Sequence, residues 1–514
     1  MWEEIEARLR SMEARALQGD ARMVERQHSE GKLTARERIE ALFDPGTFVE
    51  EFMLAETQVT DFGMAERRQP TDGVVVGTGR IDGRLVYVFA QDRTVLQGAV
   101  GQAHAEKIAY AIDTARKIGV PVVGLYDSVG ARIQEGLDVT KAIGRIFHAN
   151  SLASGAIPQI SAILGPCIGV AAYSPALTDF TFMARGAGQM FITGPAVIKQ
   201  VTGEEVTFED LGGAKVHSEV SGCADVVTAT DVDCLASIRR LLSFLPASWR
   251  VKPPVRERRD DPDRRVDELL DLVPEDSRKA YNMVAVIRRL VDEEDFFEIK
   301  PRFARNMVVG FGRLGGQPVG FVGNQPNWMA GAIDVDASDK AARFIRFCDA
   351  FGIPIISFVD VPGYLPGRDQ EHGGIIRHGA KLLYAYAEAT VPKLTVITRK
   401  DYGGAYCVMS PKQMGADLNL AWPTAEIAVM GPDAAVNIIY KRDLASAADP
   451  VAKRAQLVAD YTTRFANPYV AAERGYIDDV IEPRETRREL LRGLELCLRK
   501  TVERPPRKHG NIPL

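Results

Sequence analysis

A glycine-containing turn in the C-terminal half of the chain carries the residues best suited to chemistry. The turn Tyr402-Gly403-Gly404-Ala405-Tyr406 follows an apolar segment expected to form a strand and precedes a segment expected to form a helix. Glycine permits unusual backbone angles and leaves amide N–H groups uncovered. Two such groups that converge at a helix start would stabilise an enolate or another oxyanion. The alternative is that these glycines only allow a helix to pack tightly against a strand.

A second turn of the same kind lies in the N-terminal half. Gly169-Val170-Ala171-Ala172 also stands between an expected strand and an expected helix. Two pseudo-symmetric turns could stabilise two different enolates that develop in one reaction.

Other familiar chemistries lack their motifs. There is no G-x-S-x-G elbow, no P-loop, and no triad-like arrangement of the seven histidines. Residues 76–83 (V-G-T-G-R-I-D-G) lack the third glycine of a dinucleotide loop, so we expect a hairpin turn there. His372 and His378 are too far apart for a helical i, i+4 metal pair, so we expect a loop and its following helix, and no metal.

An internal repeat encodes the elements that position the two turns. Residues 77–132 align with residues 310–365 without a gap, and residues 165–171 align with residues 399–405. Each copy contains a hairpin-like pair of strands, a helix with a shared lysine, and a buried strand that ends at an aspartate. The shared positions include Gly77/Gly310, Gly83/Gly316, Lys107/Lys340, Pro121/Pro354, Asp127/Asp360 and Gly130/Gly363. The repeat predicts an α/β protein of two tandem units.

The length and a break in composition agree with two domains. A chain of 514 residues is too long for one ordinary core. The segment 246–265 is rich in proline and alternating charge, which is typical of a linker. We therefore expect domains at 1–250 and 266–514. Near the N-terminus, Thr34 precedes an apolar stripe and is expected to cap a helix.

Composition restricts the class of protein. The chain is 46% hydrophobic and 26% charged, with a net charge of −5, which argues against a disordered protein and against binding to nucleic acid or to a membrane surface. The six cysteines contain no C-x-x-C pair, and no apolar run is long enough for a membrane span. We expect a cytoplasmic protein.

The sequence resembles the carboxyltransferase β subunit of biotin-dependent acyl-CoA carboxylases, in the propionyl-CoA carboxylase-like branch. The resemblance covers essentially the whole chain. Its motifs include G-K-L-T-A-R-E-R-I from Gly31, A-R-I-Q-E-G from Ala131, N-Q-P-N-W-M-A-G-A-I-D from Asn324, G-G-I-I-R-H-G-A-K-L-L from Gly373, R-K-D-Y-G-G-A-Y from Arg399 and G-A-D-L-N-L-A-W-P-T-A-E-I-A-V-M-G from Gly415.

The resemblance implies a fold, an assembly and a division of labour. It implies two crotonase-like domains in a hexamer, with the acyl-CoA side in 1–250 and the biotin side in 266–514. By motif, Gly404 and Ala405 would hold the biotin ureido oxygen. Gly169, Val170 and Ala171 would hold the thioester oxygen.

The resemblance also implies a mechanism without a protein base. Carboxybiotin releases CO₂, the biotin enolate takes the α-proton of the acyl-CoA, and the thioester enolate attacks CO₂. No biotinylation motif or ATP-grasp signature is present, so biotin is expected to arrive on a separate biotin carboxylase/carrier subunit.

The chain departs from the family pattern at the acyl-CoA side. Val129 and Val170 replace glycines, and Val170 would be strained if its φ were positive. We hypothesise that the two valines reshape one pocket. Cys407 falls where the family places a residue that lines the acyl pocket, often Asp in propionyl-specific members; the alternative is an inert buried thiol. The expected substrate-binding set is Cys407, Val129, Gly130, Tyr173 and Gly403.

Three functions follow from these observations. The first is carboxyl transfer to a short acyl-CoA, with propionyl-CoA as the expected substrate. The second is the reverse transfer, by the α subunit of a sodium-pumping methylmalonyl- or glutaconyl-CoA decarboxylase, because microscopic reversibility gives both reactions the same site. A crotonase-type hydratase or isomerase is the third, but no carboxylate is evident at either turn.

Overall fold

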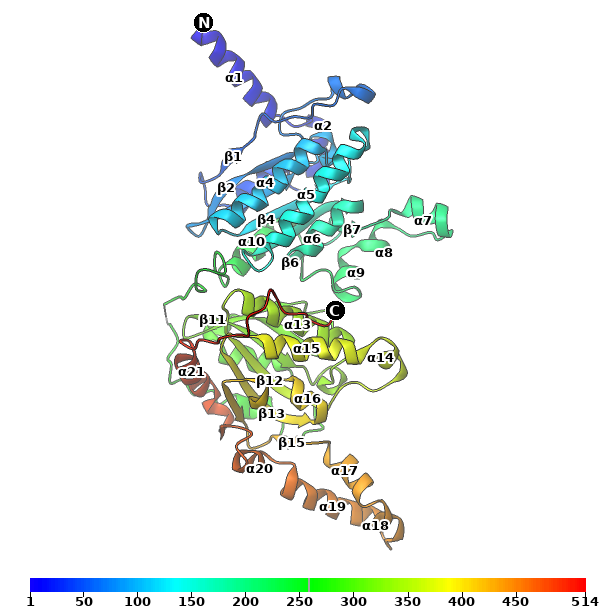
Figure 1. Ribbon diagram of the computed structural model, residues 1–514, viewed down its shortest axis with the longest axis vertical. Helices are drawn as coiled ribbons and strands as arrows, with labels where there is room; N and C mark the ends of the chain where they lie inside the picture. Colours follow the sequence, from blue (N-terminus) through cyan, green and yellow to red (C-terminus); the bar gives the residue numbers. More distant parts are fainter. Residues whose placement is uncertain (258) are drawn as a thin grey trace. The chain divides into compact units, whose positions relative to one another are not determined.

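Two sheets with the same strand order form the framework of the chain (Figure 1). The computed structural model describes residues 1–257 and 259–514, which divide into unit 1 (Met1–Lys252) and unit 2 (Pro253–Leu514). The sheet of unit 1 runs β1-β2-β3-β4-β5-β6-β8, and β7 pairs with β5. The sheet of unit 2 contains the order β9-β10-β11-β12-β13-β14-β16, and β15 pairs with β13. The repeat in the sequence is therefore a repeat of topology.

The strands of unit 1 are β1 (Val49–Glu51), β2 (Val74–Ile81), β3 (Arg84–Gln91), β4 (Val122–Ser128), β5 (Gln159–Ile168), β6 (Phe180–Ala184), β7 (Gln189–Phe191) and β8 (Val226–Thr228). Its helices are α1 (Trp2–Leu17), α2 (Ala21–Ser29), α3 (Ala35–Leu42), α4 (Gln102–Ile118), α5 (Leu137–Ala153), α6 (Tyr173–Leu177), α7 (Pro195–Thr202), α8 (Phe208–Gly212), α9 (Ala214–Glu219) and α10 (Asp231–Leu242).

The strands of unit 2 are β9 (Phe297–Ile299), β10 (Met307–Leu314), β11 (Gln317–Asn324), β12 (Ile355–Val361), β13 (Lys393–Tyr402), β14 (Leu418–Ala421), β15 (Glu426–Ala428) and β16 (Asp479–Val480). Its helices are α11 (Leu269–Leu272), α12 (Met283–Leu290), α13 (Val335–Ala350), α14 (Arg368–His372), α15 (Ile375–Glu388), α16 (Gly403–Val408), α17 (Pro432–Ile439), α18 (Lys441–Ser446), α19 (Pro450–Phe465), α20 (Pro468–Glu473) and α21 (Thr486–Cys497).

The hairpin expected from V-G-T-G-R-I-D-G is confirmed. β2 and β3 are antiparallel, with Ile81 opposite Arg84. The two connecting residues, Asp82 and Gly83, have φ of 48° and 77°, as a tight two-residue hairpin turn requires. From β3 to β6 the strands are parallel, so their carboxyl ends meet at one edge of the sheet. That edge is where ligands bind in open α/β sheets.

The shared lysines have a structural role in both units. Lys107 in α4 donates hydrogen bonds to the carbonyl oxygens of Thr71 and Val74, at 2.9 and 2.6 Å. Lys340 in α13 donates to the carbonyls of Lys300 and Phe303, each at 2.8 Å. Each lysine therefore ties a helix to the loop that leads into the first long strand of its sheet.

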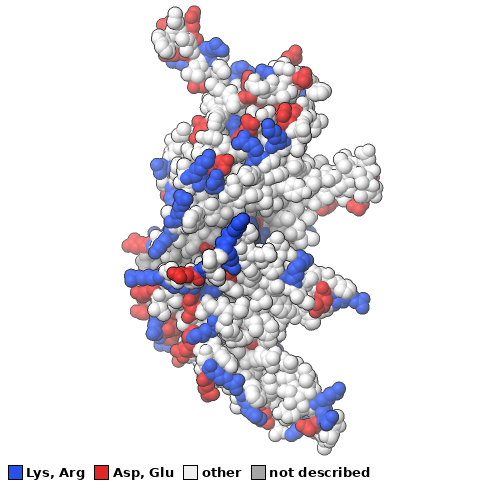
Figure 2. Space-filling model, viewed as in Figure 1, with Lys and Arg blue, Asp and Glu red and all other residues white. Residues whose placement is uncertain are grey.

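Buried apolar side chains fill the space between sheets and helices. In unit 1, Val74, Val76 and Phe89 of the sheet pack with residues of α4 and α5, which lie side by side (Figure 1). In unit 2, α17, α18 and α19 project from the sheet and carry a small apolar cluster that includes Val436 and Tyr461 (Figure 1). Figure 2 shows Lys and Arg interspersed with Asp and Glu on one face of the molecule.

Candidate active site

The turn of unit 2 needs glycine at its first position. The sequence predicts a strand over the apolar residues 394–398, but β13 extends to Tyr402, so α16 begins at Gly403 directly after the strand. Gly403 has φ of 59°, and a Cβ atom there would lie 2.9 Å from the carbonyl oxygen of Val429. Both the backbone angle and the close approach of the chain that follows β15 exclude a side chain.

The amides after Gly403 are available to a ligand. Gly404 is exposed, and a Cβ atom at this position would meet no atom of the described residues within 4 Å. Among the hydrogen bonds of residues 1–257 and 259–514, none uses the amide of Gly404 or Ala405 as donor. These amides belong to the first turn of α16, where backbone N–H groups have no partner within the helix. They can therefore stabilise a negatively charged oxygen.

A cavity of about 640 Å³ lies beside this turn. Gly403, Gly404 and Cys407 line it, together with residues from β15, α19, α20 and the segment after α20. Cys407 is exposed in the isolated chain, so the alternative of an inert buried thiol is wrong. The turn, the thiol and the cavity therefore form one site in unit 2.

The turn of unit 1 has the same backbone course. β5 ends at Ile168, and a 3₁₀-helix of residues Gly169–Ala172 follows directly. Gly169 has φ of 72°, whereas Val170 is not among the residues with positive φ. The valine is therefore unstrained and keeps its N–H group. No hydrogen bond of the described residues uses the amide of Val170 or Ala171 as donor.

The other residues predicted for the acyl-CoA side lie at the same edge. Ser128, the last residue of β4, is in register with Cys167 in β5. Gly130 has φ of 98°, and a Cβ atom there would lie 2.9 Å from the carbonyl oxygen of Ile168. Val129 is 36% exposed beside it. The segment after β4 therefore meets the end of β5 just before the turn.

Tyr173 completes the predicted set of unit 1. It is the first residue of α6 and is 50% exposed. Its ring packs edge-on against Phe147 of α5, with centroids 6.1 Å apart. The structure thus brings the predicted residues together in two groups, one in each unit.

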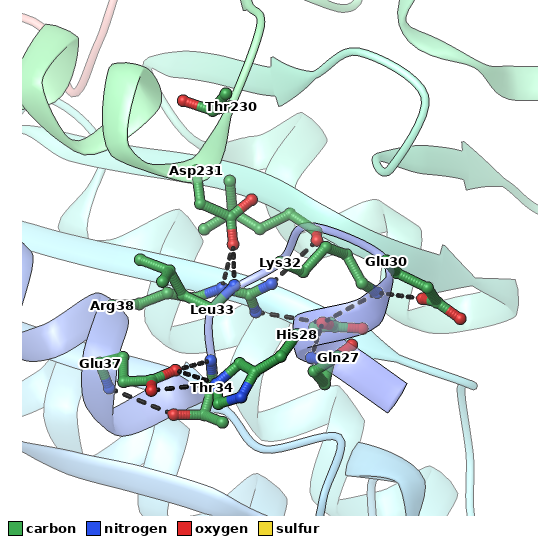
Figure 3. Close-up of polar contacts among 12 residues, drawn as sticks. Gln27, His28, Glu30, Lys32, Leu33, Thr34, Glu37, Arg38, Thr230 and Asp231 are labelled. Carbon is green, nitrogen blue, oxygen red and sulfur yellow. Dashed lines mark hydrogen bonds and ion pairs between the residues drawn. The ribbon is translucent and has the colours of Figure 1, made fainter. Parts of the chain in front are cut away.

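A buried aspartate lies behind each turn, and sequence reasoning did not find its partners. Asp127 lies one residue before the end of the buried strand β4, 3.1 Å from Arg38 and 3.7 Å from Lys32. Arg38 of α3 also contacts Asp231, at 2.7 Å (Figure 3). Thr34 and Glu37 form a capping box that fixes the start of α3, as predicted for Thr34 (Figure 3). The motif G-K-L-T-A-R-E-R-I therefore supplies counter-ions to the sheet.

In unit 2 the counter-ions come from the neighbouring strand. Asp360 lies 2.8 Å from Arg399 and 3.7 Å from Lys400, both in β13. The equivalent of Arg399 in unit 1 is Gly165, where a Cβ atom would lie 2.0 Å from Oδ1 of Asp127. Gly165 therefore leaves the space that Asp127 occupies.

Asp401 is a buried acid that sequence reasoning missed. Its side chain is 2% exposed, and Oδ1 has no hydrogen-bond partner among the described residues. Burial, and then the charge of Asp360, raise the pKa of Asp401 well above its ordinary value of 3.8. Its counterpart in unit 1 is Cys167, since both residues immediately precede the last residue of the strand before the turn. Nothing in the pattern R-K-D-Y-G-G marks this acid as lacking a partner.

Unit 1 also contains a cation-lined cavity of about 560 Å³ that was not predicted. Its lining includes four cations, Arg26, Lys32, Arg93 and Arg185, and two acids, Glu30 and Asp231. Pro166 and Gln189, which pair between β5 and β7, also line it. The cavity therefore lies close to the strand that ends at the turn of unit 1.

The two histidines considered as a metal pair, His372 and His378, lie in consecutive helices. His372 ends the short helix α14 rather than lying in a loop, and Nδ1 of His378 in α15 lies 2.8 Å from Asp339. The described residues contain no cluster of three or more His, Cys, Asp or Glu suited to a metal ion.

Among the helices of residues 1–257 and 259–514, none has the length and hydropathy of a membrane span.

Comparison with known proteins identifies the family. Residues 26–512 match the model of the carboxyl transferase domain. The carboxyltransferase subunit of propionyl-CoA carboxylase from Haloferax mediterranei is 56% identical over 98% of both chains. The methylmalonyl-CoA decarboxylase subunit alpha of Propionigenium modestum is 55% identical, over 97% of this chain and 96% of its own.

A solved structure is similar to this chain over nearly its full length. Transcarboxylase 12S, described as a hexamer assembly with methylmalonyl-coenzyme A bound, matches with a TM-score of 0.96 and 47% identity, over 99% of this chain and 98% of its own. The expected α/β fold of two crotonase-like units is confirmed. The chain therefore belongs to the carboxyl transferase domain family and is a carboxyltransferase.

Proposed function

We propose that this chain is the carboxyltransferase component of a biotin-dependent acyl-CoA carboxylase and that it carboxylates a short acyl-CoA, with propionyl-CoA as the substrate. The name of the Haloferax mediterranei relative supports the substrate. The observation that carries the proposal is the pair of turns with available amides, Gly169–Ala171 and Gly403–Ala405. Carboxyl transfer from biotin to a thioester develops negative charge on two different oxygens, and each turn can hold one.

The biotin side of the proposal rests on the turn of unit 2. Carboxybiotin, when bound, supplies the carboxyl group to be transferred. The amides of Gly404 and Ala405 would donate hydrogen bonds to the ureido oxygen. A cavity of about 640 Å³ with a largely apolar lining suits a compact bicyclic ring, and the open space at Gly404 lets that ring approach the backbone.

The acyl-CoA side rests on unit 1. The amides of Val170 and Ala171 would hold the thioester oxygen at the carboxyl edge of the sheet. Val129, Gly130 and Tyr173 lie at that edge and would line the acyl group. The cavity near β5, where four cations outnumber the acids Glu30 and Asp231, suits the phosphates of coenzyme A by charge.

The chemistry needs no ionisable side chain at the turns. Backbone amides keep a fixed direction and donate without losing a proton, so they act the same way in both directions of transfer. Placing the two substrates against two rigid turns supplies much of the remaining rate enhancement.

For the assembly we propose a homohexamer that works with a biotin carboxylase/biotin carrier subunit. Transcarboxylase 12S is described as a hexamer, which supports the proposed homohexamer. A mass of six chains of 56.4 kDa by light scattering would agree, and a stable monomer would contradict it. We propose the cytoplasm as its location, although several relatives are mitochondrial by name.

Reconstitution tests the function directly. The purified chain is combined with biotin carboxylase and biotinylated carrier subunits, ATP, labelled bicarbonate and acyl-CoA substrates from acetyl to branched five-carbon chains. We expect label in the acyl-CoA product, with the highest kcat/KM for propionyl-CoA. Labelled carrier without any labelled acyl-CoA would contradict the proposal.

The decarboxylase is a second candidate because its subunit alpha is 55% identical, nearly the same as the carboxylase subunit. The site would be the same, with transfer in reverse. Purification from the native cell separates the two: an ATP-dependent biotin carboxylase partner supports the carboxylase, and a polytopic membrane subunit supports the decarboxylase.

A further inference from the structure

Among the described residues, one charged side chain lines the cavity beside the turn of unit 2. Arg474 lines it together with Gly404 and Cys407, and it is the only charged residue among the described residues of its lining. No ion pair or hydrogen bond of the guanidinium is present among residues 1–257 and 259–514, and the side chain is exposed. The remaining lining is mainly apolar and aromatic, including Val429 and Phe465. The cavity therefore suits a largely apolar ligand with one anionic group.

The backbone holds Arg474 in place. Asn467 caps the start of α20 by accepting a hydrogen bond from the amide of Val470 at 3.1 Å. At the other end, Gly475 has φ of 70°, and the amide of Tyr476 donates to the carbonyl of Ala471 at 2.9 Å. A left-handed glycine with this 6→1 hydrogen bond is a standard helix C-terminus. Arg474 therefore projects from a fixed helix end rather than from a loose loop.

We propose that Arg474 binds the carboxylate that is being transferred. The guanidinium is planar and pairs with a carboxylate through two parallel hydrogen bonds. The turn amides are suited to a single oxyanion, so the carboxylate needs a partner of its own. Arg474 makes and breaks no covalent bond in this role; it is a binding residue. The inference rests on the proposed function, because that function brings a carboxylated ligand to this cavity.

The carboxylate can come from two sources that share this chemistry. One is the carbamate of carboxybiotin, and the other is the carboxyl group of a malonyl-type thioester such as methylmalonyl-CoA. Neither propionyl-CoA nor free biotin has a carboxyl group at the transferred position. Loss of Arg474 should therefore weaken binding of the compounds that carry the transferred carboxylate and spare propionyl-CoA, which has no carboxylate.

The test uses the full chain with Arg474→Gln and Arg474→Lys, and with Arg442→Gln as a matched control. Arg442 is an exposed arginine of α18 that does not line the cavity. One arm measures transfer from methylmalonyl-CoA to free biotin, and the other measures transfer from carboxybiotin to propionyl-CoA. We expect Arg474→Gln to raise KM for a carboxylated compound by about 10- to 100-fold. The Kd for propionyl-CoA should not change, and Arg474→Lys should recover part of the loss.

Each pattern of results has one meaning. A higher KM for methylmalonyl-CoA alone assigns Arg474 to the thioester carboxylate. A higher KM for carboxybiotin alone assigns it to the carbamate, and a higher KM for both compounds assigns it to both carboxylates. Unchanged KM values in an active variant would overturn the inference. An affinity for propionyl-CoA that falls as much as the affinity for the carboxylated compounds would also overturn it. An inactive wild-type chain would instead reject the proposed function.

Discussion

The turns of the two units share a backbone course but differ in what surrounds them. Gly169 and Gly403 both have positive φ, yet a Cβ atom would lie 3.9 Å from the nearest atom at Gly169 and 2.9 Å at Gly403. At the next position, Val170 stands in unit 1 where Gly404 stands in unit 2, and neither has positive φ. The first glycine is thus a requirement of the backbone in both units. The second position decides only how much space lies above the turn.

The buried residues behind the turns also differ between the two units, in their charges and in the partners of those charges. Asp127 takes its partners from the N-terminal segment that leads into and forms α3, whereas Asp360 takes them from β13. Cys167 in unit 1 is replaced by the acid Asp401 in unit 2. One topology therefore tolerates different arrangements of charge, provided that a buried acid either meets an opposite charge, as Asp127 and Asp360 do, or has its pKa raised and keeps its proton, as Asp401 does.

The largest expected difference between the turns is at their first glycine. Gly403→Ala forces the backbone away from Val429 and displaces the amides of Gly404 and Ala405, so we expect kcat for carboxyl transfer to fall about 100- to 1,000-fold. Gly169→Ala has room for its Cβ and incurs only the φ penalty of about 1–2 kcal/mol, so more activity should remain. Steady-state kinetics give kcat for Gly403→Ala and Gly169→Ala, and the two values can then be compared.

The control for these variants is Gly352→Ala. Gly352 has φ of 65° and follows α13 away from the turn, and a Cβ atom there would lie more than 4 Å from every atom that the structure describes. This substitution should lower stability without lowering kcat. Wild-type activity in Gly403→Ala would contradict the role of the turn amides.

The second comparison concerns Asp401 and Cys167. Because the pKa of Asp401 is raised, the folded chain keeps a proton that the unfolded chain loses above about pH 4. The free energy of unfolding of the wild type should therefore fall relative to Asp401→Asn as the pH rises, by about 1.4 kcal/mol per pH unit, until the pH reaches the pKa of the folded state.

Urea unfolding between about pH 5 and pH 7 measures this difference. Asp401→Cys, which copies unit 1, should show the same trend as Asp401→Asn, and the exposed Asp443→Asn should follow the wild type. Parallel curves for wild type and Asp401→Asn would show that Asp401 is already ionised.

A smaller effect is expected at the two valines of unit 1. If Val129 and Val170 narrow one pocket, Val129→Gly with Val170→Gly should raise the butyryl-CoA to propionyl-CoA ratio of kcat/KM roughly 5- to 10-fold. Val220→Gly, at an exposed position after α9, is the control. An unchanged acyl-CoA profile in the double variant would reject the hypothesis that the valines act together.

The smallest expected effect is at Cys407, whose counterpart in unit 1 is Tyr173. Cys407→Asp places a carboxylate beside the cavity of unit 2. The family resemblance implies that the residue at this position also lines the acyl pocket, and there a carboxylate disfavours a longer apolar acyl chain. The propionyl-CoA to butyryl-CoA rate ratio should rise a few-fold, roughly 2- to 5-fold. Cys223→Asp, at the exposed cysteine of unit 1, should leave the ratio unchanged. No change in Cys407→Asp would remove this residue from the specificity set.

Local patterns predicted much of the fold. The hairpin at residues 81–84, the cap at Thr34 and the strand before Gly403 depend on neighbours a few residues away, which the sequence shows directly. The internal repeat then predicted two similar units, because each copy carries the same order of elements. His372 was misplaced because a single helical turn such as α14 leaves little periodicity to detect.

The sequence by itself determined which turns have glycine at the strand-to-helix junction and which positions the two units share. Only the tertiary structure revealed that Arg38 reaches Asp127, that Asp401 has a carboxyl oxygen without a partner among the described residues, and that Arg474 enters the cavity beside Gly404. The physical reason is distance along the chain. A turn is specified by the angles and amides of adjacent residues, whereas charge pairing and burial depend on side chains that only folding brings together.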